Sequence, residues 1–169
     1  MNRLNVFNNT YYRWRYPDCW WKNIKIFFSS FREAYQRITR GFSYCDVWDF
    51  DTYLAELMAQ GLNVLADDGW GYPGDEEFPT KESWEEYLHD VSNLFRFYLD
   101  DHYNEYEKDW VATWENKSLV DGLRGEKTPE EREITDKYLD REGEIEGEKY
   151  AAAQKALRMI AHVWGNLWD

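Results

Sequence analysis

The chain has 169 residues, of which 43% are hydrophobic and 19% aromatic, and its formal net charge is −13. This length and composition exclude intrinsic disorder over most of the chain and fit one domain, residues 1–169, with a buried core. The negative charge argues against direct binding to nucleic acid, which needs a positive surface. An acidic surface keeps a protein soluble and also suits competition for basic sites on another protein.

The charge is unevenly distributed along the chain. The first 45 residues carry eight basic and two acidic side chains, a net of +6, and the other 124 carry 12 basic and 31 acidic, a net of −19. The basic part contains the run Tyr11-Tyr12-Arg13-Trp14-Arg15-Tyr16. Guanidinium groups pair with phosphates and aromatic rings stack, so this run fits a flat anionic ligand. It fits equally well a segment that docks on an acidic partner, including the rest of its own chain.

The N-terminal part is expected to hold an arm and a helix. Rings and arginines alternate in residues 1–18, which predicts an extended arm. A helix is expected from about Cys19 to Arg40, with a possible break at Ser29-Ser30 and its end at Gly41. Its apolar stripe, expected to face the core, is Phe27, Phe28, Phe31, Tyr35 and Ile38.

A second helix is expected from about Asp49 to Asp67, with Asp49 or Asp51 as its cap and Asp68-Gly69 as its end. Gly61 within it suggests a close neighbour on that side, because a mid-helix glycine is otherwise costly. Its apolar stripe, also expected to be core, is Phe50, Tyr53, Leu54, Leu57, Met58, Leu62 and Leu65.

Residues 69–79 are expected to be a loop, after which Thr80 caps the helix with the clearest periodicity. That core stripe is Trp84, Tyr87, Leu88, Val91, Leu94, Phe95, Tyr98 and Leu99. Residues 100–127 are predicted to be an acidic short helix plus a loop.

Thr128-Pro129-Glu130-Glu131 is a strong helix start, with a capping threonine, proline at the first position and acid in the first turn. It predicts a long C-terminal helix over residues 128–169, whose apolar face is Ala153, Leu157, Ile160, Val163, Trp164 and Leu167. No Val/Ile-rich run suggests a strand. The expected fold is therefore a mainly α, single-domain bundle of four to five helices.

Catalytic and metal-binding motifs are missing from the sequence, so we expect no enzyme activity, no cofactor and no metal. Cys45 has no evident histidine partner, and Cys19 and Cys45 are expected to be free thiols. His89 and His102 fall on or just past an acidic helix face, which favours surface positions over metal binding. No signal peptide or membrane span is evident, so a cytoplasmic protein is expected.

The candidate binding residues fall in two groups. Arg37 and Arg40 could clamp a phosphate near a ring of Tyr35 or Trp48, with Asp46 or Asp49 accepting ribose hydroxyls. The alternative is an internal arginine–aspartate network that joins two helices, with the carboxylates as caps or ion-pair partners. The second group is Arg13, Trp14 and Arg15 in the arm.

Residues 35–51 carry a turn of the form R-x-x-R-G-[FY], here Arg37 to Phe42, followed by Asp46-Val47-Trp48-Asp49 at a helix start. This segment resembles the signature of a family of small tailed-phage proteins. The resemblance continues through Leu62-Asn63-Val64-Leu65, Gly71-Tyr72-Pro73 and Trp84, and closes with Asn166-Leu167-Trp168-Asp169. It does not extend to residues 100–148. It implies a phage origin and expression in a bacterial cytoplasm, and it implies no particular chemistry.

Three functions follow as hypotheses. The first is a phage accessory protein that counters host defence by sequestering a small nucleotide-like signal. The second is an acidic inhibitor that occludes a host protein, for example at its nucleic-acid-binding site. The third is a structural homo-oligomer in which the basic arm of one subunit docks on the acidic face of another.

Overall fold

The computed structural model describes residues 31–114 and 128–167 of the chain. Residues 31–40 form a helix, followed by α2 (Phe50–Asp68), α3 (Lys81–Leu99), α4 (Glu107–Ala112), α6 (Pro129–His162) and the short 3-10 helix η1 (Trp164–Asn166). No strand occurs in these two ranges. The predicted mainly α bundle is confirmed. The arm, the possible break at Ser29-Ser30 and residues 115–127 lie outside the described residues.

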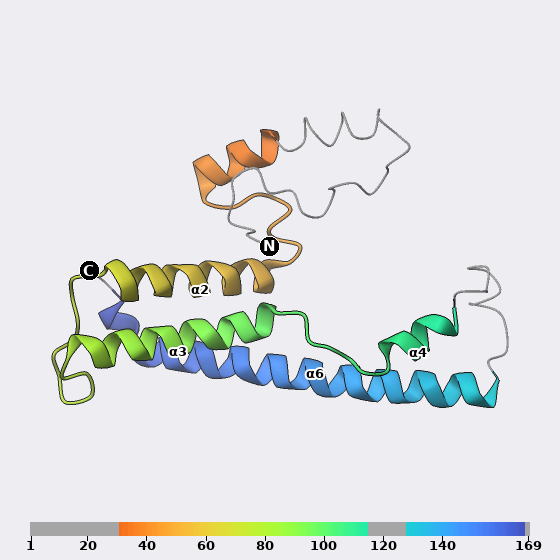
Figure 1. Cartoon of the computed structure of the whole chain (residues 1–169). Coiled ribbons are helices and arrows are strands. Elements are labelled where there is room, and N and C mark those ends of the chain that lie inside the picture. Colours follow the sequence, from red (N-terminus) through yellow and green to blue (C-terminus); the bar gives the residue numbers. More distant parts are fainter. Residues whose placement is uncertain (1–30, 115–127, 168–169) are drawn as a thin grey trace.

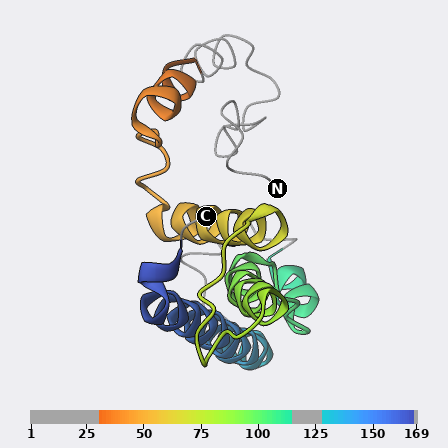
Figure 2. The same cartoon turned by 90° about the vertical axis from the view of Figure 1, so that its left-hand side faces the viewer.

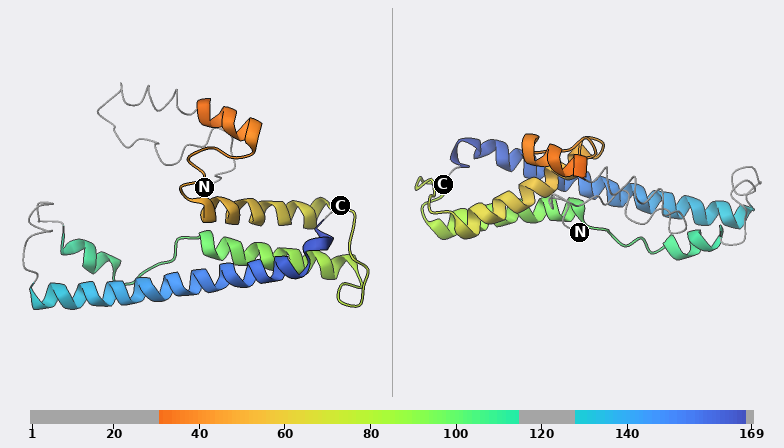
Figure 3. Two further views of the ribbon diagram at one scale, coloured as in Figure 1. Left: turned by 180° about the vertical axis from the view of Figure 1, so that it is seen from behind. Right: turned by 90° about the horizontal axis from the view of Figure 1, so that it is seen from above.

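The helices α2, α3 and α6 form the body of the structure (Figure 1). α3 packs against both α2 and α6, so it lies between them. At about 1.5 Å per residue, the 34 residues of α6 extend about 50 Å and the 19 of α3 about 28 Å. α6 therefore runs well past the end of α3, and α4 lies along this extension (Figure 3). No helix in the described part is both long and apolar enough to span a membrane.

The core lies where α2, α3 and α6 meet. α3 presents the predicted stripe: Trp84, Leu88, Val91 and Phe95 are at most 2% exposed. Tyr87, Leu94, Tyr98 and Leu99 pack partly buried beside them. Polar bonds join the layers, because Ser92 Oγ donates to the carbonyl of Ala59 in α2 and Tyr87 OH donates to that of Met159 in α6.

The buried face of α2 matches the predicted stripe only in part, because Leu62 is buried and Met58 and Leu65 pack against the core. Ala55, Ala59, Leu62 and Ala66 are buried, whereas Phe50 and Leu57 are exposed. The three alanines, which the predicted stripe left out, complete this face beside Leu62 and allow the large side chains of α3 to come close. The expected close neighbour of Gly61 is also absent, because a Cβ there would meet nothing within 4 Å among the atoms of the structure as described.

The helix ends follow the sequence signals closely. Thr80 and Thr128 each accept a hydrogen bond from the backbone N–H three residues on, and Ser83 and Glu131 return it, which completes a capping box at α3 and at α6. Gly69 ends α2, and a Cβ there would collide with the carbonyl of Leu65. Asp49 occupies the cap position of α2 but makes no side-chain capping bond.

The C-terminal half of α6 contributes Ala156 and Ile160 to the core, and Val163 follows directly after the helix. The predicted face was partly wrong, because Leu157 is 47% and Trp164 65% exposed. In the other half of α6, Tyr138 stacks on Trp110 of α4 with ring centroids 4.4 Å apart. That contact fixes α4 on the extended part of α6.

The 31–40 helix lies on the side of α2 opposite α3 and α6 (Figures 1 and 2). Its predicted core stripe is wrong where it can be seen: Phe31, Tyr35 and Ile38 are 52%, 67% and 71% exposed. Glu33 and Ala34 are the buried residues of this helix instead. Because its large apolar side chains are exposed, this helix is a candidate functional surface.

Candidate functional site

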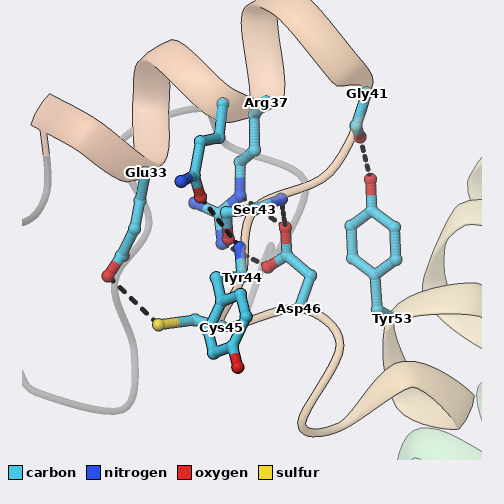
Figure 4. A network of polar contacts seen from close by, with 9 residues as sticks. Glu33, Arg37, Gly41, Ser43, Tyr44, Cys45, Asp46 and Tyr53 are labelled. Carbon is cyan, nitrogen blue, oxygen red and sulfur yellow. Dashed lines mark hydrogen bonds and ion pairs between the residues drawn. The ribbon is translucent and has the colours of Figure 1, made fainter.

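The 31–40 helix ends in a turn that is fastened to α2. Gly41 has φ +82°, the left-handed conformation that favours glycine, and its N–H donates to the carbonyl of Arg37. The carbonyl of Gly41 accepts a 2.5 Å hydrogen bond from the hydroxyl of Tyr53, which lies in the first turn of α2. The predicted stop at Gly41 is confirmed, and Tyr53 anchors this stop to the next helix (Figure 4).

Arg37 and Asp46 form an ion pair across the turn. Arg37 Nε donates to Asp46 Oδ2 at 2.9 Å and Nη2 to Oδ1 at 2.5 Å, a two-point contact. The backbone N–H of Ser43 also donates to Asp46 Oδ2, at 2.6 Å. The two side chains are only 10% and 7% exposed. The internal network, one of the two alternatives from the sequence, therefore describes this pair.

The ion pair shifts the pKa values of both Arg37 and Asp46. The hydrogen bond to Asp46 raises the pKa of Arg37 above its ordinary value, against the opposing effect of burial. Burial acts to raise the pKa of Asp46, but hydrogen bonds from Arg37 and Ser43 outweigh it and leave that pKa below its ordinary value. Both groups are charged at neutral pH, and the pair is closed to a third charged group unless it opens.

Two further bonds extend the network along the same turn (Figure 4). Cys45 Sγ donates to Glu33 Oε1 at 3.1 Å, and the N–H of Tyr44 donates to Gln36 Oε1 at 2.9 Å. Burial, followed by the hydrogen bond and charge of Glu33, raises the pKa of the Cys45 thiol to about 12. Glu33 is 3% exposed, and its Oε2 has no hydrogen-bond partner in the described structure. Cys45 is a free thiol, as expected, and its environment makes it inert.

Around this buried network the segment exposes an unusual number of large apolar side chains. Eight within 20 consecutive residues are between 43% and 80% exposed. They are Phe31, Tyr35, Ile38, Phe42, Tyr44, Val47, Trp48 and Phe50. We call residues 31–50 the aromatic segment. Its polar groups hold the backbone in place, and its rings face solvent.

The predicted site residues do not form one site in the structure. Arg37 and Asp46 come together as an ion pair. Tyr35, Arg40, Trp48 and Asp49 are all exposed on the same segment, with Trp48 at 80%. No hydrogen bond or ring contact joins Arg40 and Trp48 in the described structure. Arg13, Trp14 and Arg15 lie outside the described residues.

Sequence reasoning missed the residues that complete the network: Glu33, Gln36, Ser43 and Tyr53. One signal was available, because Glu33 and Arg37 are four apart on a helix and so lie on one face with Gln36 beside them. Tyr53 was assigned to a core stripe, and nothing local to it indicates a bond to the carbonyl of Gly41.

The described residues place no group of three or more His, Cys, Asp or Glu side chains where they could hold a metal ion. His89 and His102, the two histidines expected at the surface, are both partly exposed, and His102 Nε2 donates to the carbonyl of Phe97 at 2.8 Å. His89 pairs with Asp67 with its side chain 41% exposed, and His162 pairs with Glu77 at 58%. Both contacts tie neighbouring segments together.

Comparisons with models of protein families, with curated proteins and with solved structures found no match to this chain.

Proposed function

We propose that this chain is a non-enzymatic phage accessory protein that counters host defence by binding and occluding a host protein. The observation that carries the proposal is the concentration of eight exposed large apolar side chains in the aromatic segment. Single exposed apolar residues are ordinary, but a concentration of them marks an interaction surface. Tyrosine and tryptophan, both present here, are also the residues that most often dominate binding energy.

The buried network supports this role by fixing the surface before binding. The Arg37–Asp46 pair and the Tyr53 bond to Gly41 fasten the turn between the 31–40 helix and α2. A surface held in its bound conformation loses less conformational entropy when it binds a partner. The acidic scaffold adds a second property. Residues 129–150 of α6 carry nine acidic and four basic side chains, which favours approach to a basic partner.

Sequestration of a nucleotide is supported less well. One of its two groups of residues was Arg37 and Arg40 acting together on a phosphate, and Arg37 is engaged by Asp46 at two points. The other group, Arg13, Trp14 and Arg15, lies outside the described residues. A phosphate would have to displace a carboxylate that is already charged and hydrogen-bonded. The phage origin in the proposal depends on the sequence resemblance alone.

Site-specific photo-crosslinking tests the proposal. A photoreactive phenylalanine analogue replaces Trp48 in one variant and Trp164, which is 65% exposed on η1, in a control variant. Each is expressed in bacteria and irradiated, and the products are identified by mass. We expect a protein adduct at position 48 and none at position 164. Adducts at both positions or at neither contradict the proposal, and a crosslink from position 48 to a second copy of the chain would support the homo-oligomer instead.

Isothermal titration calorimetry distinguishes nucleotide sequestration from the binding of a host protein. Titration with cyclic and ADP-ribose-type nucleotides should give no heat. Saturable heat that Arg37→Gln abolishes and Arg32→Gln leaves unchanged would replace protein occlusion with nucleotide sequestration.

A further inference from the structure

A cavity of about 600 Å³ opens between the start of α2, the end of α3 and the middle of α6. It contains none of the residues of the aromatic segment. Thr52 of α2 lies on one side, Tyr98 and His102 on a second, and Tyr138 and Tyr150 of α6 on a third. Its volume is within the range of small-ligand sites, about 300–1,000 Å³.

The wall of this cavity carries an excess of negative charge. Asp101, Glu107, Glu142 and Glu146 line it, and Lys149 is the one lysine or arginine among its described lining residues. The ammonium group of Lys149 donates to the backbone carbonyl of Asp100 at 2.9 Å. No ion pair within the described residues involves Asp101, Glu107 or Glu146, so these three carboxylates are not neutralised by the chain's own described side chains.

Aromatic rings line the same cavity. Tyr98 and Tyr150 contact each other with ring centroids 6.0 Å apart, and Tyr138 is held by its stacking on Trp110. Burial and the hydrogen bond to Asp51 raise the pKa of Tyr98 to about 12, so its hydroxyl keeps its proton at neutral pH. Ring faces attract cations through their negative quadrupole, and the carboxylates add direct ion pairing.

The inner part of the cavity is rigid. Asn104 is 3% exposed and donates from Nδ2 to the carbonyl of Tyr138 and to Glu142 Oε2, at 3.1 and 2.9 Å. Its Oδ1 accepts from the N–H of Tyr106 at 3.0 Å. Ile145 beside it is 5% exposed. These bonds fix the loop after α3 to α6 at the inner end of the cavity.

We infer that this cavity binds an arginine side chain presented by a basic segment of the protein partner. Carboxylates and tyrosine rings alternate in the lining, on α6 and on the segment from the end of α3 to α4, and together they match the charge and the flat face of a guanidinium group. The inference rests on the proposed function and names the chemistry of the partner. Thr52 lies two residues after the end of the aromatic segment, so the start of α2 connects this segment to the edge of the cavity.

Calorimetric titration of the full chain tests the inference. The probe is the blocked peptide Gly-Arg-Gly-Arg-Gly, compared with the same peptide carrying citrulline, the neutral isostere of arginine. We expect saturable binding of the arginine peptide, at least tenfold weaker binding of the citrulline peptide, and weaker binding at higher salt.

Two charge-matched variants separate the cavity from general attraction to an acidic protein. Asp101→Asn/Glu146→Gln removes two cavity carboxylates, and Glu144→Gln/Glu148→Gln removes two from α6 outside the cavity. The first should weaken peptide binding at least fivefold and the second less than twofold, with helical content unchanged in both by circular dichroism. Equal effects of the two variants, equal binding of the citrulline peptide, or no binding at millimolar peptide each overturn the inference.

A negative result for arginine binding in the cavity can be distinguished from a negative result for protein binding by the aromatic segment. Trp48→Ala should leave peptide binding in the cavity unchanged, because Trp48 does not line it. If position 48 forms a protein crosslink but the arginine peptide does not bind, the aromatic segment binds a protein and the cavity is not part of that interaction.

Discussion

Arg37 and Asp46 decide how the aromatic segment is held. Each side chain is at least 90% covered, and each satisfies the other at two points. A buried ion pair is costly to break from one side, because the remaining charge has no partner. Among the described residues 31–50, Ala34 is the only buried apolar side chain, so we expect the local structure of the segment to depend on this polar contact more than the three-helix core does.

Asp46→Asn should therefore loosen residues 31–46 without unfolding the protein. Loss of one partner of a buried pair costs about 3 kcal/mol or more, which corresponds to roughly hundredfold faster amide exchange in this segment. Exchange in α3 should stay the same. Arg40→Gln is the matched control on the same helix, because Arg40 is exposed and makes no ion pair within the described residues. Equal effects of the two variants would contradict this role of the pair.

The same pair predicts a pH dependence. The pKa of Asp46 is lower in the folded state than the ordinary value of about 3.9, so the pair stabilises the segment above about pH 4. Its contribution falls as the pH drops through the folded pKa. Amide protection of residues 31–46, corrected for intrinsic exchange rates, should decrease below about pH 4 in the wild type. The Asp46→Asn variant should not show this loss of amide protection. If the variant still loses protection below about pH 4, other carboxylates cause the pH dependence.

Cys45 should react slowly with alkylating reagents. Burial and the contact with Glu33 raise the pKa of its thiol from 9.0 to about 12, and the thiolate is the reactive form. At pH 8 this shift lowers the thiolate fraction about a thousandfold. Peptide mass mapping after iodoacetamide treatment measures the rate at this position, and Glu33→Gln should increase it severalfold. Fast labelling of the wild type would show that the thiol is not held as described.

Among the elements, α3 and α6 are the ones that the sequence predicts best. Thr80 and Thr128 predict their starts, and Leu88 and Val91 fall on the buried face that the 3.6-residue period indicates. α2 is harder to predict because apolar residues occur nearly all around it. Periodicity alone then does not define one buried face. It also does not indicate that the small alanines of α2 are the residues that pack closely against α3.

Thr80→Ala should weaken α3 at its start. The substitution removes the acceptor for the N–H of Ser83 and breaks the capping box, which costs about 1 kcal/mol and about 2–4 °C in the melting temperature of a protein of this size. Asn93→Ala, an exposed position in the middle of α3, is the control and should not lower stability. Thermal unfolding followed by circular dichroism compares the two, and equal melting temperatures would refute the contribution of the cap.

The whole molecule depends on α3, since it is packed against both α2 and α6. Leu88 of α3 is 0% exposed, whereas Leu157 of α6 is 47% exposed. Leu88→Ala should lower the free energy of unfolding by about 2–5 kcal/mol, and Leu157→Ala by much less. Denaturant unfolding measures both. Similar costs for the two leucines would mean that the core is not where α2, α3 and α6 meet.

The functional surfaces could be predicted only in part. The sequence indicates that arginines, aspartates and rings gather between residues 35 and 51, but it leaves open whether Arg37 binds a ligand or Asp46. The cavity has no local signal, because its residues come from positions as far apart as Thr52, Tyr98 and Tyr150 and meet only through helix packing. The exposure of Phe31 and Tyr35 likewise depends on where their helix lies relative to the core.

Binding of a host protein by the exposed rings of the aromatic segment can be measured by capture from lysates. Quantitative mass spectrometry compares the proteins captured from lysates of a panel of bacterial species by the wild type, Trp48→Ala and Trp164→Ala. We expect a protein that is enriched by the wild type and by Trp164→Ala, and reduced at least tenfold with Trp48→Ala. A captured protein that all three retain equally, or no enriched protein in any lysate, would contradict this expectation.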